Sequence, residues 1–231
     1  MTADQLGRLT LVGTPIGNLA DLTDGALAAL RAADVVCAED TRRTRKLLTA
    51  FDLHPARLVS VRAHNEAHEA VRVRRWLAEG RQVVYVTDAG MPVLSDPGQR
   101  LARLVLDAGA TVAVAPGPDA VTTALLRSGL PVRRWCFEGF LPVKGGARAR
   151  RLAAIGAQTR AVVLFEAPHR LLRTLADLVA AAGPDRPAAV LNDLTKLFER
   201  AWRGSLGPVA AQLAGVEPRG EFVVVLGQTG R

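Results

Sequence analysis

Short apolar runs alternate with helix-like segments in the first half of the chain. The runs are rich in Val and stand at Leu9–Gly13, Val35–Ala38, Leu58–Val61, Gln82–Thr87 and Thr111–Ala115. Continuous apolar runs of this length are typical of strands that are buried on both faces of a parallel sheet. The pattern therefore predicts five strands of one parallel sheet.

The segments between these runs carry apolar residues at helical spacing. Thr23, Asp40 and Asn65 can N-cap three helices, and Gly80 can end the third. A fourth helix is predicted before Gly109, with Leu101, Leu104, Val105 and Ala108 on one face. Regular alternation of strands and helices predicts βαβ units with right-handed crossovers, and hence an α/β fold.

The segment PGPDA (116–120) predicts a hinge, because two prolines around a glycine continue neither a strand nor a helix. The hinge suggests two domains, 1–116 and 117–231. Strand signals in the second domain are Trp135–Phe140, Ala161–Phe165, Ala188–Leu191 and Phe222–Leu226. Its best helix runs from His169 to about Ala182, opened by Pro168 and stopped by Gly183. Gly145 and Gly146 predict a mobile loop.

The composition is that of a folded globular protein. Apolar residues make up 49% and charged residues 23% of the chain, which suits a sizeable core and excludes a disordered chain. No apolar run approaches the roughly 20 residues that span a bilayer. The N-terminus lacks the pattern of a signal peptide, so a cytoplasmic protein is expected. Cys37 and Cys136 lie in apolar runs without metal-ligand spacing, which predicts buried, reduced thiols.

The positive charge is concentrated in the second half. The chain has 30 basic and 22 acidic residues. Residues 1–117 contain 14 basic and 13 acidic residues, and residues 118–231 contain 16 basic and 9 acidic residues. A basic surface attracts polyanions such as nucleic acid. The Arg-rich composition of a GC-rich genome is the alternative explanation. With ten aromatic residues, a sheet that recognises bases by stacking is not expected.

Four loops rich in Gly, Pro and Asp follow the predicted strands. They are GTPIGN (13–18), AED (38–40), TDAGMP (87–92) with SDPG (95–98), and PGPDA (116–120). Ligands of open α/β sheets bind at the carboxyl ends of the strands, so these loops predict a ligand pocket. GTPIGN matches neither the dinucleotide fingerprint nor the P-loop. The sequence contains neither metal-ligand clusters nor the GxSxG motif of hydrolases, and no metal is expected.

Six ordered blocks carry a family resemblance. They are LTLVGTPIGNLADLT, DVVCAEDTRRTRKLL, YVTDAGMPVLSDPG, PGPDAVTTALLRSGLP, FEGFLP and LFEAPHRLLRTLADL. In this order they resemble the tetrapyrrole (corrin/porphyrin) methylase superfamily, and within it the branch that 2′-O-methylates ribose in small-subunit ribosomal RNA. The resemblance runs from about Leu9 to the terminal GEFVVVLG.

The resemblance implies a fold, a cofactor and a substrate. It implies two αβα domains, with a mainly parallel sheet in the first and a mixed sheet in the second, and with S-adenosylmethionine in a cleft between them. It also implies a homodimer. The methyl acceptor would be the 2′-hydroxyl of a cytidine in small-subunit ribosomal RNA, as free RNA or in the assembled small ribosomal subunit.

The chain departs from the usual pattern of this branch at several positions. It has TDAGMP, PGPDA and NDLTK where the branch often has SDAGTP, PGPSA and RELTK. Asp119 places a carboxylate near the expected cationic sulfonium. Met91 lacks the hydroxyl of threonine, and Asn192 lacks a charge that could touch RNA. Many relatives also carry a short C-terminal extension that is absent from this sequence.

Methyl transfer to an alcohol is an in-line displacement, in which the protein mainly aligns the reacting atoms. Gly17 and Gly90 would permit close approach of the backbone, and Asp88 could hold the methionine ammonium or a ribose hydroxyl of the cofactor. Helix capping is the alternative for Asp88 and Asp96. The cofactor-binding candidates are Pro15, Ile16, Gly17, Asp88, Ala89, Gly90, Met91, Pro92, Leu94, Ser95, Pro118, Asp119, Ala120, Phe165 and Glu166.

A base that accepts the hydroxyl proton would add to catalysis. Glu39, His169 and Lys196 are the candidates. Glu39 lies at a strand end, where desolvation would raise its pKa. Lys196 could act as a base only if its pKa were depressed. Neighbouring Asp40 is better explained as a helix cap. Two basic clusters are the RNA-binding candidates, although each could be an ordinary solvated face. They comprise Arg42, Arg43 and Arg45, and Lys144, Arg148, Arg150 and Arg151.

Two other functions compete with this interpretation. A tetrapyrrole C-methylase of the same superfamily predicts a GxGxGDP-like first loop and a GGDP third loop, which GTPIGN and DAGMP replace here. A non-catalytic RNA-binding assembly factor would keep the fold as a scaffold and would not bind S-adenosylmethionine.

Overall fold

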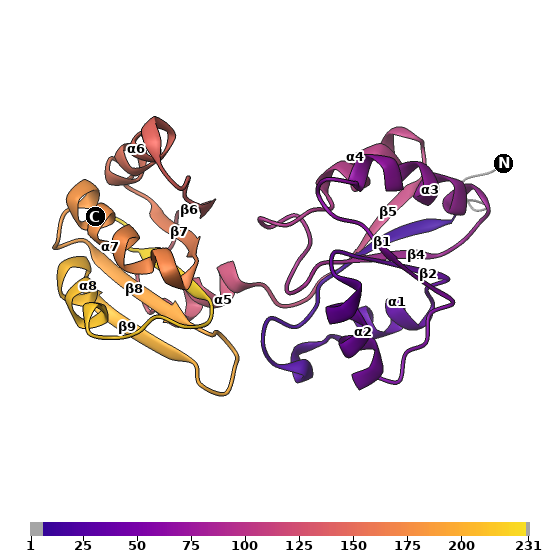
Figure 1. Ribbon diagram of the computed structural model, residues 1–231, viewed down its shortest axis with the longest axis horizontal. Coiled ribbons are helices and arrows are strands. Elements are labelled where there is room, and N and C mark those ends of the chain that lie inside the picture. Colours follow the sequence, from indigo (N-terminus) through magenta and orange to yellow (C-terminus); the bar gives the residue numbers. More distant parts are fainter. Residues whose placement is uncertain (1–6, 230–231) are drawn as a thin grey trace. The chain divides into compact units, whose positions relative to one another are not determined.

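A computed structural model describes residues 7–229, and its internal contacts divide the chain between Asp119 and Ala120 into two units (Figure 1). The division lies within the PGPDA segment, in which the predicted hinge is located. Each unit contains one five-stranded sheet with helices on both faces. The two units are described separately below.

The first unit is built on a parallel sheet of five strands in the order β3-β2-β4-β1-β5. The central strands β2 and β4 are buried along their whole length, which is why their sequences are apolar at every position. The five predicted runs all form strands, as the sequence predicts. The strands are β1 (Arg8–Val12), β2 (Val35–Ala38), β3 (Arg57–Ser60), β4 (Val83–Val86) and β5 (Thr111–Ala115).

Helices cover both faces of this sheet. On one face Leu77 and Val105 of α3 and α4 pack with Tyr85, and on the other Leu30 and Leu48 of α1 and α2 pack against the strands. The helical elements are η2 (Leu19–Asp21), α1 (Asp24–Arg31), α2 (Thr41–Ala50), α3 (Glu66–Ala78) and α4 (Gln99–Asp107). The result is the predicted αβα layering.

The helix caps follow the predictions in part. Thr23 accepts a hydrogen bond from the backbone N–H of Ala26 at the start of α1, and Asp40 accepts one from Arg42 at the start of α2. Asn65 precedes α3, but its side chain does not cap the helix. At α4 the carboxylate of buried Glu66 accepts hydrogen bonds from the backbone N–H groups of Gly98 and Leu101, so the cap comes from another helix.

The second unit has a mixed sheet in the order β6-β7-β10-β8-β9. Only the pair β6–β7 is parallel; the other neighbouring pairs are antiparallel. The strands are β6 (Trp135–Phe140), β7 (Ala161–Glu166), β8 (Pro187–Asn192), β9 (Arg200–Ser205) and β10 (Phe222–Leu226). The sequence did not predict β9, because this edge strand is half-exposed and carries no apolar run.

Helices α6, α7 and α8 form one buried cluster with the second sheet, which includes Ile155, Leu171 and Leu213. Helix α5 contacts β7, β8 and β10, and its buried residues, among them Val121 and Leu125, lie outside that cluster. The helices are α5 (Ala120–Ser128), α6 (Gly145–Gly156), α7 (Pro168–Ala182) and α8 (Leu206–Ala214). Of these, the sequence predicted only α7. The predicted mobile loop at Gly145 is wrong, because this glycine begins α6.

Both cysteines are free thiols. Cys37 is fully buried in β2, and this burial raises the pKa of its thiol to about 12. Cys136 is half-buried in β6. No helix between residues 7 and 229 combines the length and the apolar character that a membrane crossing requires.

Candidate functional site

Three of the predicted loops meet at the carboxyl edge of the first sheet. Thr14, after β1, and Gly90, after β4, exchange two backbone hydrogen bonds of 3.0 Å. Gly13 packs so closely against the loop after β5 that a Cβ atom on it would lie 2.7 Å from the backbone nitrogen of Gly117. The close approach at Gly13 requires glycine, and the two sets of contacts bring the predicted cofactor loops together.

Met91 replaces the threonine of the usual family pattern and takes part in this packing. Its sulfur lies 3.3 Å from the backbone nitrogen of Gly117 and accepts a hydrogen bond from it. The thioether is a weak acceptor, but it fills the space beside Gly13. The departure at this position therefore keeps the loops after β4 and β5 in contact.

The loop after β4 contains strained backbone and an unsatisfied polar group. Val93 and Ser95 have φ angles of 79° and 69°, in the left-handed region that residues with a Cβ seldom adopt. Such strain clusters at ligand sites. The hydroxyl of Thr87 is buried and has no hydrogen-bond partner within the described part of the chain. A ligand that supplied a partner here would gain a hydrogen bond at a buried group.

The predicted cofactor residues of the first unit differ in exposure. Ile16, Gly90 and Pro92 are buried, and Gly17 and Ser95 are exposed. Leu94 is exposed as well, whereas the remaining members, Pro15, Asp88, Ala89, Met91, Pro118 and Asp119, are half-buried. The set thus includes side chains within the loop packing and side chains at its surface.

Glu39, Asp88 and Asp96 form an acidic cluster beside these loops. The backbone N–H of Asp40 donates to Asp88 at 3.1 Å, and that of Asp88 donates to Glu39 at 3.4 Å. Burial raises the pKa of Glu39, as the sequence predicts, and the charge of Asp88 adds to the effect against the opposing backbone hydrogen bond. Such a carboxylate can accept a proton or hold a cation.

Asp96 is a member of this cluster, and helix capping, the alternative that the sequence offers for it, does not describe its position. Gly98 holds the capping position of α4 instead. Burial, followed by the charges of Glu39 and Asp88, raises the pKa of Asp96 to about 7. In the sequence, the motif SDPG in the loop after the predicted strand could have identified Asp96 as a site residue. Asp40 is different, since hydrogen bonds from Arg42 hold its pKa far below the usual range.

The basic cluster on α2 is exposed. Arg42 is paired with Asp40 at 2.7 Å, and Arg43 lies 3.4 Å from the carboxylate of Asp88. Arg45 is also exposed on this helix. Cations therefore lie directly beside the acidic cluster.

Among the cofactor-binding candidates in the second unit, Glu166 has a carboxylate that is already bonded within the protein. Its side chain is fully buried, accepts hydrogen bonds from the hydroxyl of Thr174 at 2.6 Å and from the backbone of Ala167 at 2.8 Å, and pairs with Arg170. These contacts occupy the carboxylate, so a direct cofactor contact through this side chain is not supported. Phe165 is half-buried and packs edge-on against Phe137 at 4.8 Å. Ala120 begins α5 and is half-buried.

The prediction that Arg148 binds RNA is wrong. Helix α6 turns this side chain inward, where only 5% of it is exposed. Its guanidinium donates to Asp177 at 2.7 Å, to Thr174 at 2.9 Å and to the carbonyl of Pro142 at 3.1 Å. Arg148 therefore fixes the β6–α6 connection.

The other three members of this basic cluster are exposed: Lys144, Arg150 and Arg151. Arg151 pairs with Glu138 at 2.7 Å.

Lys196 is a poor candidate for a base. Burial alone would lower its pKa, but hydrogen bonds to Asp193 at 2.6 Å and Glu221 at 3.0 Å outweigh burial and raise it. The ammonium therefore stays charged, contrary to the requirement stated for a base at this position. His169 is exposed in the first turn of α7.

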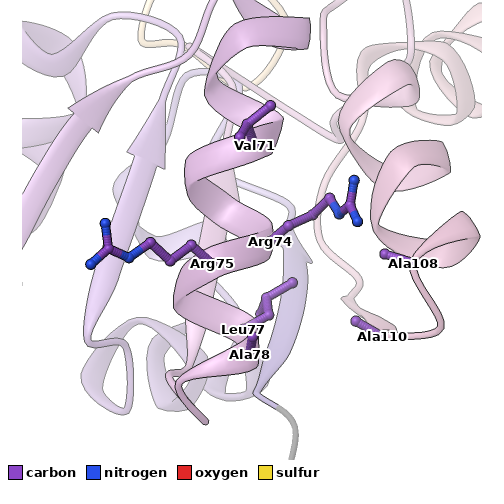
Figure 2. Close-up of a pocket in the computed structure, with 7 residues that line it drawn as sticks. All are labelled: Val71, Arg74, Arg75, Leu77, Ala78, Ala108 and Ala110. Carbon is purple, nitrogen blue, oxygen red and sulfur yellow. The ribbon is translucent and has the colours of Figure 1, made fainter.

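An open pocket of about 400 Å³ lies at the opposite edge of the first sheet, between the C-terminal ends of α3 and α4 (Figure 2). Figure 2 shows Arg74 extending toward α4 and Arg75 extending from the other side of α3. The lining residues are Val71, Arg74, Arg75, Leu77, Ala78, Ala108 and Ala110. None of the predicted site residues lines it.

Between residues 7 and 229 no group of three or more His, Cys, Asp or Glu side chains is arranged to hold a metal ion.

The chain is similar to known proteins over most of its length. The family model described as Tetrapyrrole (Corrin/Porphyrin) Methylases matches residues 8–210. A protein of Mycobacterium tuberculosis named "Ribosomal RNA small subunit methyltransferase I" is 47% identical over 95% of this chain and 77% of its own length. A Thermotoga maritima protein of the same name is 41% identical, with 96% of this chain and 98% of its own length covered.

Solved structures of lower identity share the fold. Uroporphyrin-III C-methyltransferase from Thermus thermophilus, in a structure described as complexed with S-adenyl homocysteine, has a TM-score of 0.66 at 23% identity, with 96% of this chain and 97% of that chain covered. The cobalt precorrin-4 methyltransferase CbiF has a TM-score of 0.73 at 18% identity, covering 95% and 94% of the two chains.

Proposed function

Because this chain belongs to the tetrapyrrole (corrin/porphyrin) methylase family, we propose that it is an S-adenosylmethionine-dependent methyltransferase that acts on the 2′-hydroxyl of a cytidine ribose in small-subunit ribosomal RNA. One observation carries the proposal: relatives named as small-subunit ribosomal RNA methyltransferases are 41–47% identical over nearly the whole chain. We also propose a homodimer that acts in the cytoplasm on free RNA or on the small ribosomal subunit.

The carboxyl edge of the first sheet is the proposed place of the cofactor. The strained loop after β4 and the unsatisfied hydroxyl of Thr87 are features that a bound ligand would explain, and the glycine contacts after β1 and β5 bring the loops together there. Backbone groups of residues 13–18, 87–95 and 117–120 would hold the cofactor, and Asp88 would bind its ammonium or a ribose hydroxyl. A protein of the same fold with bound S-adenyl homocysteine supports the choice of ligand.

S-adenosylmethionine supplies an activated methyl group on a sulfonium, so the protein has mainly to position the acceptor. A ribose hydroxyl that accepts this methyl group would have to lose its proton. Glu39 is the proposed acceptor of that proton. Its pKa is raised toward neutral pH, which makes its carboxylate a stronger base. Alignment of the reacting atoms contributes more, on the order of 7–11 kcal/mol.

The RNA would be held by the exposed cations. Arg42, Arg43 and Arg45 on α2 and Lys144, Arg150 and Arg151 around the start of α6 are accessible for phosphate contacts. Contacts of this kind position an RNA without reading its sequence.

C-methylation of a tetrapyrrole is the alternative within the family. The structural relative with that activity in its name is 23% identical, whereas the ribosomal RNA methyltransferases are 41–47% identical. The excess of positive charge after Gly117 also favours a polyanionic substrate.

The proposal predicts methyl transfer to RNA. The purified protein is incubated with methyl-labelled S-adenosylmethionine and, in separate reactions, small ribosomal subunits, free small-subunit RNA and a tetrapyrrole precursor. We expect label on the 2′-oxygen of a cytidine, detected as a nucleotide linkage that resists alkaline hydrolysis. Label in the tetrapyrrole and none in RNA would contradict the proposal.

A further inference from the structure

The turn between β8 and β9 exposes two large apolar side chains. Leu197 is 89% exposed and Phe198 is 75% exposed, at adjacent positions of the chain. The turn joins two long strands at one end of the second sheet (Figure 1). Single exposed apolar residues are ordinary, but an adjacent pair at the end of a hairpin contributes nothing to the core and calls for a partner.

The turn that carries this pair is held by charged contacts. Lys196 pairs with Asp193 at 2.6 Å and with Glu221 at 3.0 Å. The backbone N–H of Thr195 donates to Glu199 at 2.8 Å, and Glu199 pairs with Arg127 of α5 at 2.6 Å.

The backbone of the turn is also strained. Asp193 and Thr195 adopt φ angles of 50° and 63°, which persist only where surrounding contacts impose them. Leu197 and Phe198 are thus presented by a fixed turn, and little conformational entropy is lost when a partner binds.

The directions of the strands place the turn on the edge that carries basic residues. Strand β7 is antiparallel to β10 and β10 is antiparallel to β8, so β8 runs in the same direction as β7 and β6. The turn after β8 therefore lies at the same edge of the sheet as the segment after β6, which contains Lys144, and as the first turn of α7.

Two arginines close to the turn keep their positive charge available. Arg200 is exposed directly after it, and Arg203 donates to the backbone carbonyls of Arg127 and Ser128. Within residues 7–229 neither arginine forms an ion pair with a carboxylate. An apolar tip beside such cations matches RNA, which offers both phosphates and unstacked bases.

We propose that Leu197 and Phe198 form an apolar wedge that packs against an unstacked base of the RNA substrate. The inference rests on the proposed function and names a contact of its substrate. Proteins that insert Phe or Leu beside nucleic-acid bases use the same chemistry. The other occupant to be considered is a second copy of the chain, as in the proposed homodimer, and the test below distinguishes it from RNA.

The test compares substitutions at Phe198 with a matched exposed residue elsewhere. Phe198→Ala should raise the KM for small ribosomal subunits about tenfold, the loss that removal of one stacking contact causes. Phe198→Tyr, which keeps the ring, should restore a KM close to that of the wild type. Val71→Ala removes a side chain that is 66% exposed on α3 and should leave the KM unchanged. Affinity for S-adenosylmethionine and the melting temperature should be unaltered in all three variants.

Other results would overturn the wedge in distinguishable ways. If the wild type methylates RNA and Phe198→Ala keeps the wild-type KM, the wedge is wrong and the proposed function stands. If Phe198→Ala changes the oligomeric state in sedimentation, the pair belongs to an interface between copies of the chain, and the wedge is also wrong. If the wild type transfers no methyl group to RNA, the proposed function fails first and the wedge fails with it.

Discussion

Three neighbouring carboxylates give the carboxyl edge of the first sheet its chemical character. Burial raises the pKa of Glu39 and of Asp96; the charge of Asp88 adds to the effect at Glu39, and the charges of Glu39 and Asp88 add to it at Asp96. Asp40, one residue from Glu39, has the opposite shift because Arg42 is bonded to it. The sequence distinguished Glu39 from Asp40, but it could not predict the shift at Asp96, because that shift depends on burial and on charges from other loops.

The raised pKa of Asp96 predicts a pH-dependent stability. In the folded protein Asp96 titrates near pH 7, against about 4 in an unfolded chain. The folded state therefore binds this proton more tightly, so the stabilising contribution is complete below about pH 4 and is lost as the pH rises to about 7. Asp96→Asn removes this pH-dependent loss of stability: we expect a melting temperature several degrees above that of the wild type at pH 8, and no gain at pH 4.

Thermal denaturation at the two pH values measures this effect. Asp107→Asn is the matched control, because Asp107 lies at the surface in an exposed pair with Arg103. A gain for Asp96→Asn that is equal at both pH values would show that its carboxyl group does not have the raised pKa.

Asp88 is the residue that we expect to contact the cofactor through its charge. Asp88→Asn keeps an oxygen that can accept the hydrogen bond from the backbone of Asp40, but it removes the negative charge. We expect about tenfold weaker binding of S-adenosylmethionine, because charged hydrogen bonds are roughly twice as strong as neutral ones. Isothermal titration measures the affinity and circular dichroism verifies folding. Unchanged affinity would remove Asp88 from the cofactor site.

At the level of secondary-structure elements, α6 shows how a buried arginine anchors a helix. Its sequence begins with two glycines and has few large apolar residues, which is why a loop was predicted. In the structure Arg148 and Ile155 point inward from α6, and Arg148 joins Asp177 of α7 to the carbonyl of Pro142. Hydrogen bonds from Arg148 to α7 thus provide part of the stabilisation that apolar packing provides for other helices.

The two arginines around Asp177 allow a comparison of buried and exposed pairs. Asp177→Ala leaves the buried guanidinium of Arg148 without its carboxylate and should lower the free energy of unfolding by about 3 kcal/mol. Arg173→Ala removes only an exposed partner at 4.0 Å and should cost less than about 0.5 kcal/mol. Urea denaturation measures both. Equal effects would mean that the interior contacts of Arg148 do not anchor α6.

Across the whole molecule, the excess of positive charge lies after Gly117. Several of these cations are used internally: Arg148 and Arg186 are buried, and Lys196 is paired. The charge available to RNA is therefore smaller than the composition suggests, and Lys144 and Arg150 are prominent members of the exposed set.

The salt dependence of RNA binding should show whether Lys144 and Arg150 contact phosphates. The double substitution Lys144→Ala and Arg150→Ala should weaken binding and reduce the slope of log affinity against log salt by about 1–2, because each phosphate contact releases counterions. Filter binding between 50 and 200 mM salt provides the measurement. Arg103→Ala, on α4 of the first unit, is the control for loss of an exposed arginine. An unchanged slope for the double variant would exclude these phosphate contacts.

Apolar periodicity by itself determined the parallel sheet, the helices of the first unit and α7, because strands buried on both faces and amphipathic helices leave a local pattern. Order and spacing of the loop motifs determined the family. The tertiary structure decided what local pattern cannot encode: β9 and α6 form through contacts with distant segments, Arg148 turns inward because Asp177 lies opposite, and Asp96 acquires its pKa from carboxylates on other loops. Each of these properties depends on neighbours that are remote in the sequence.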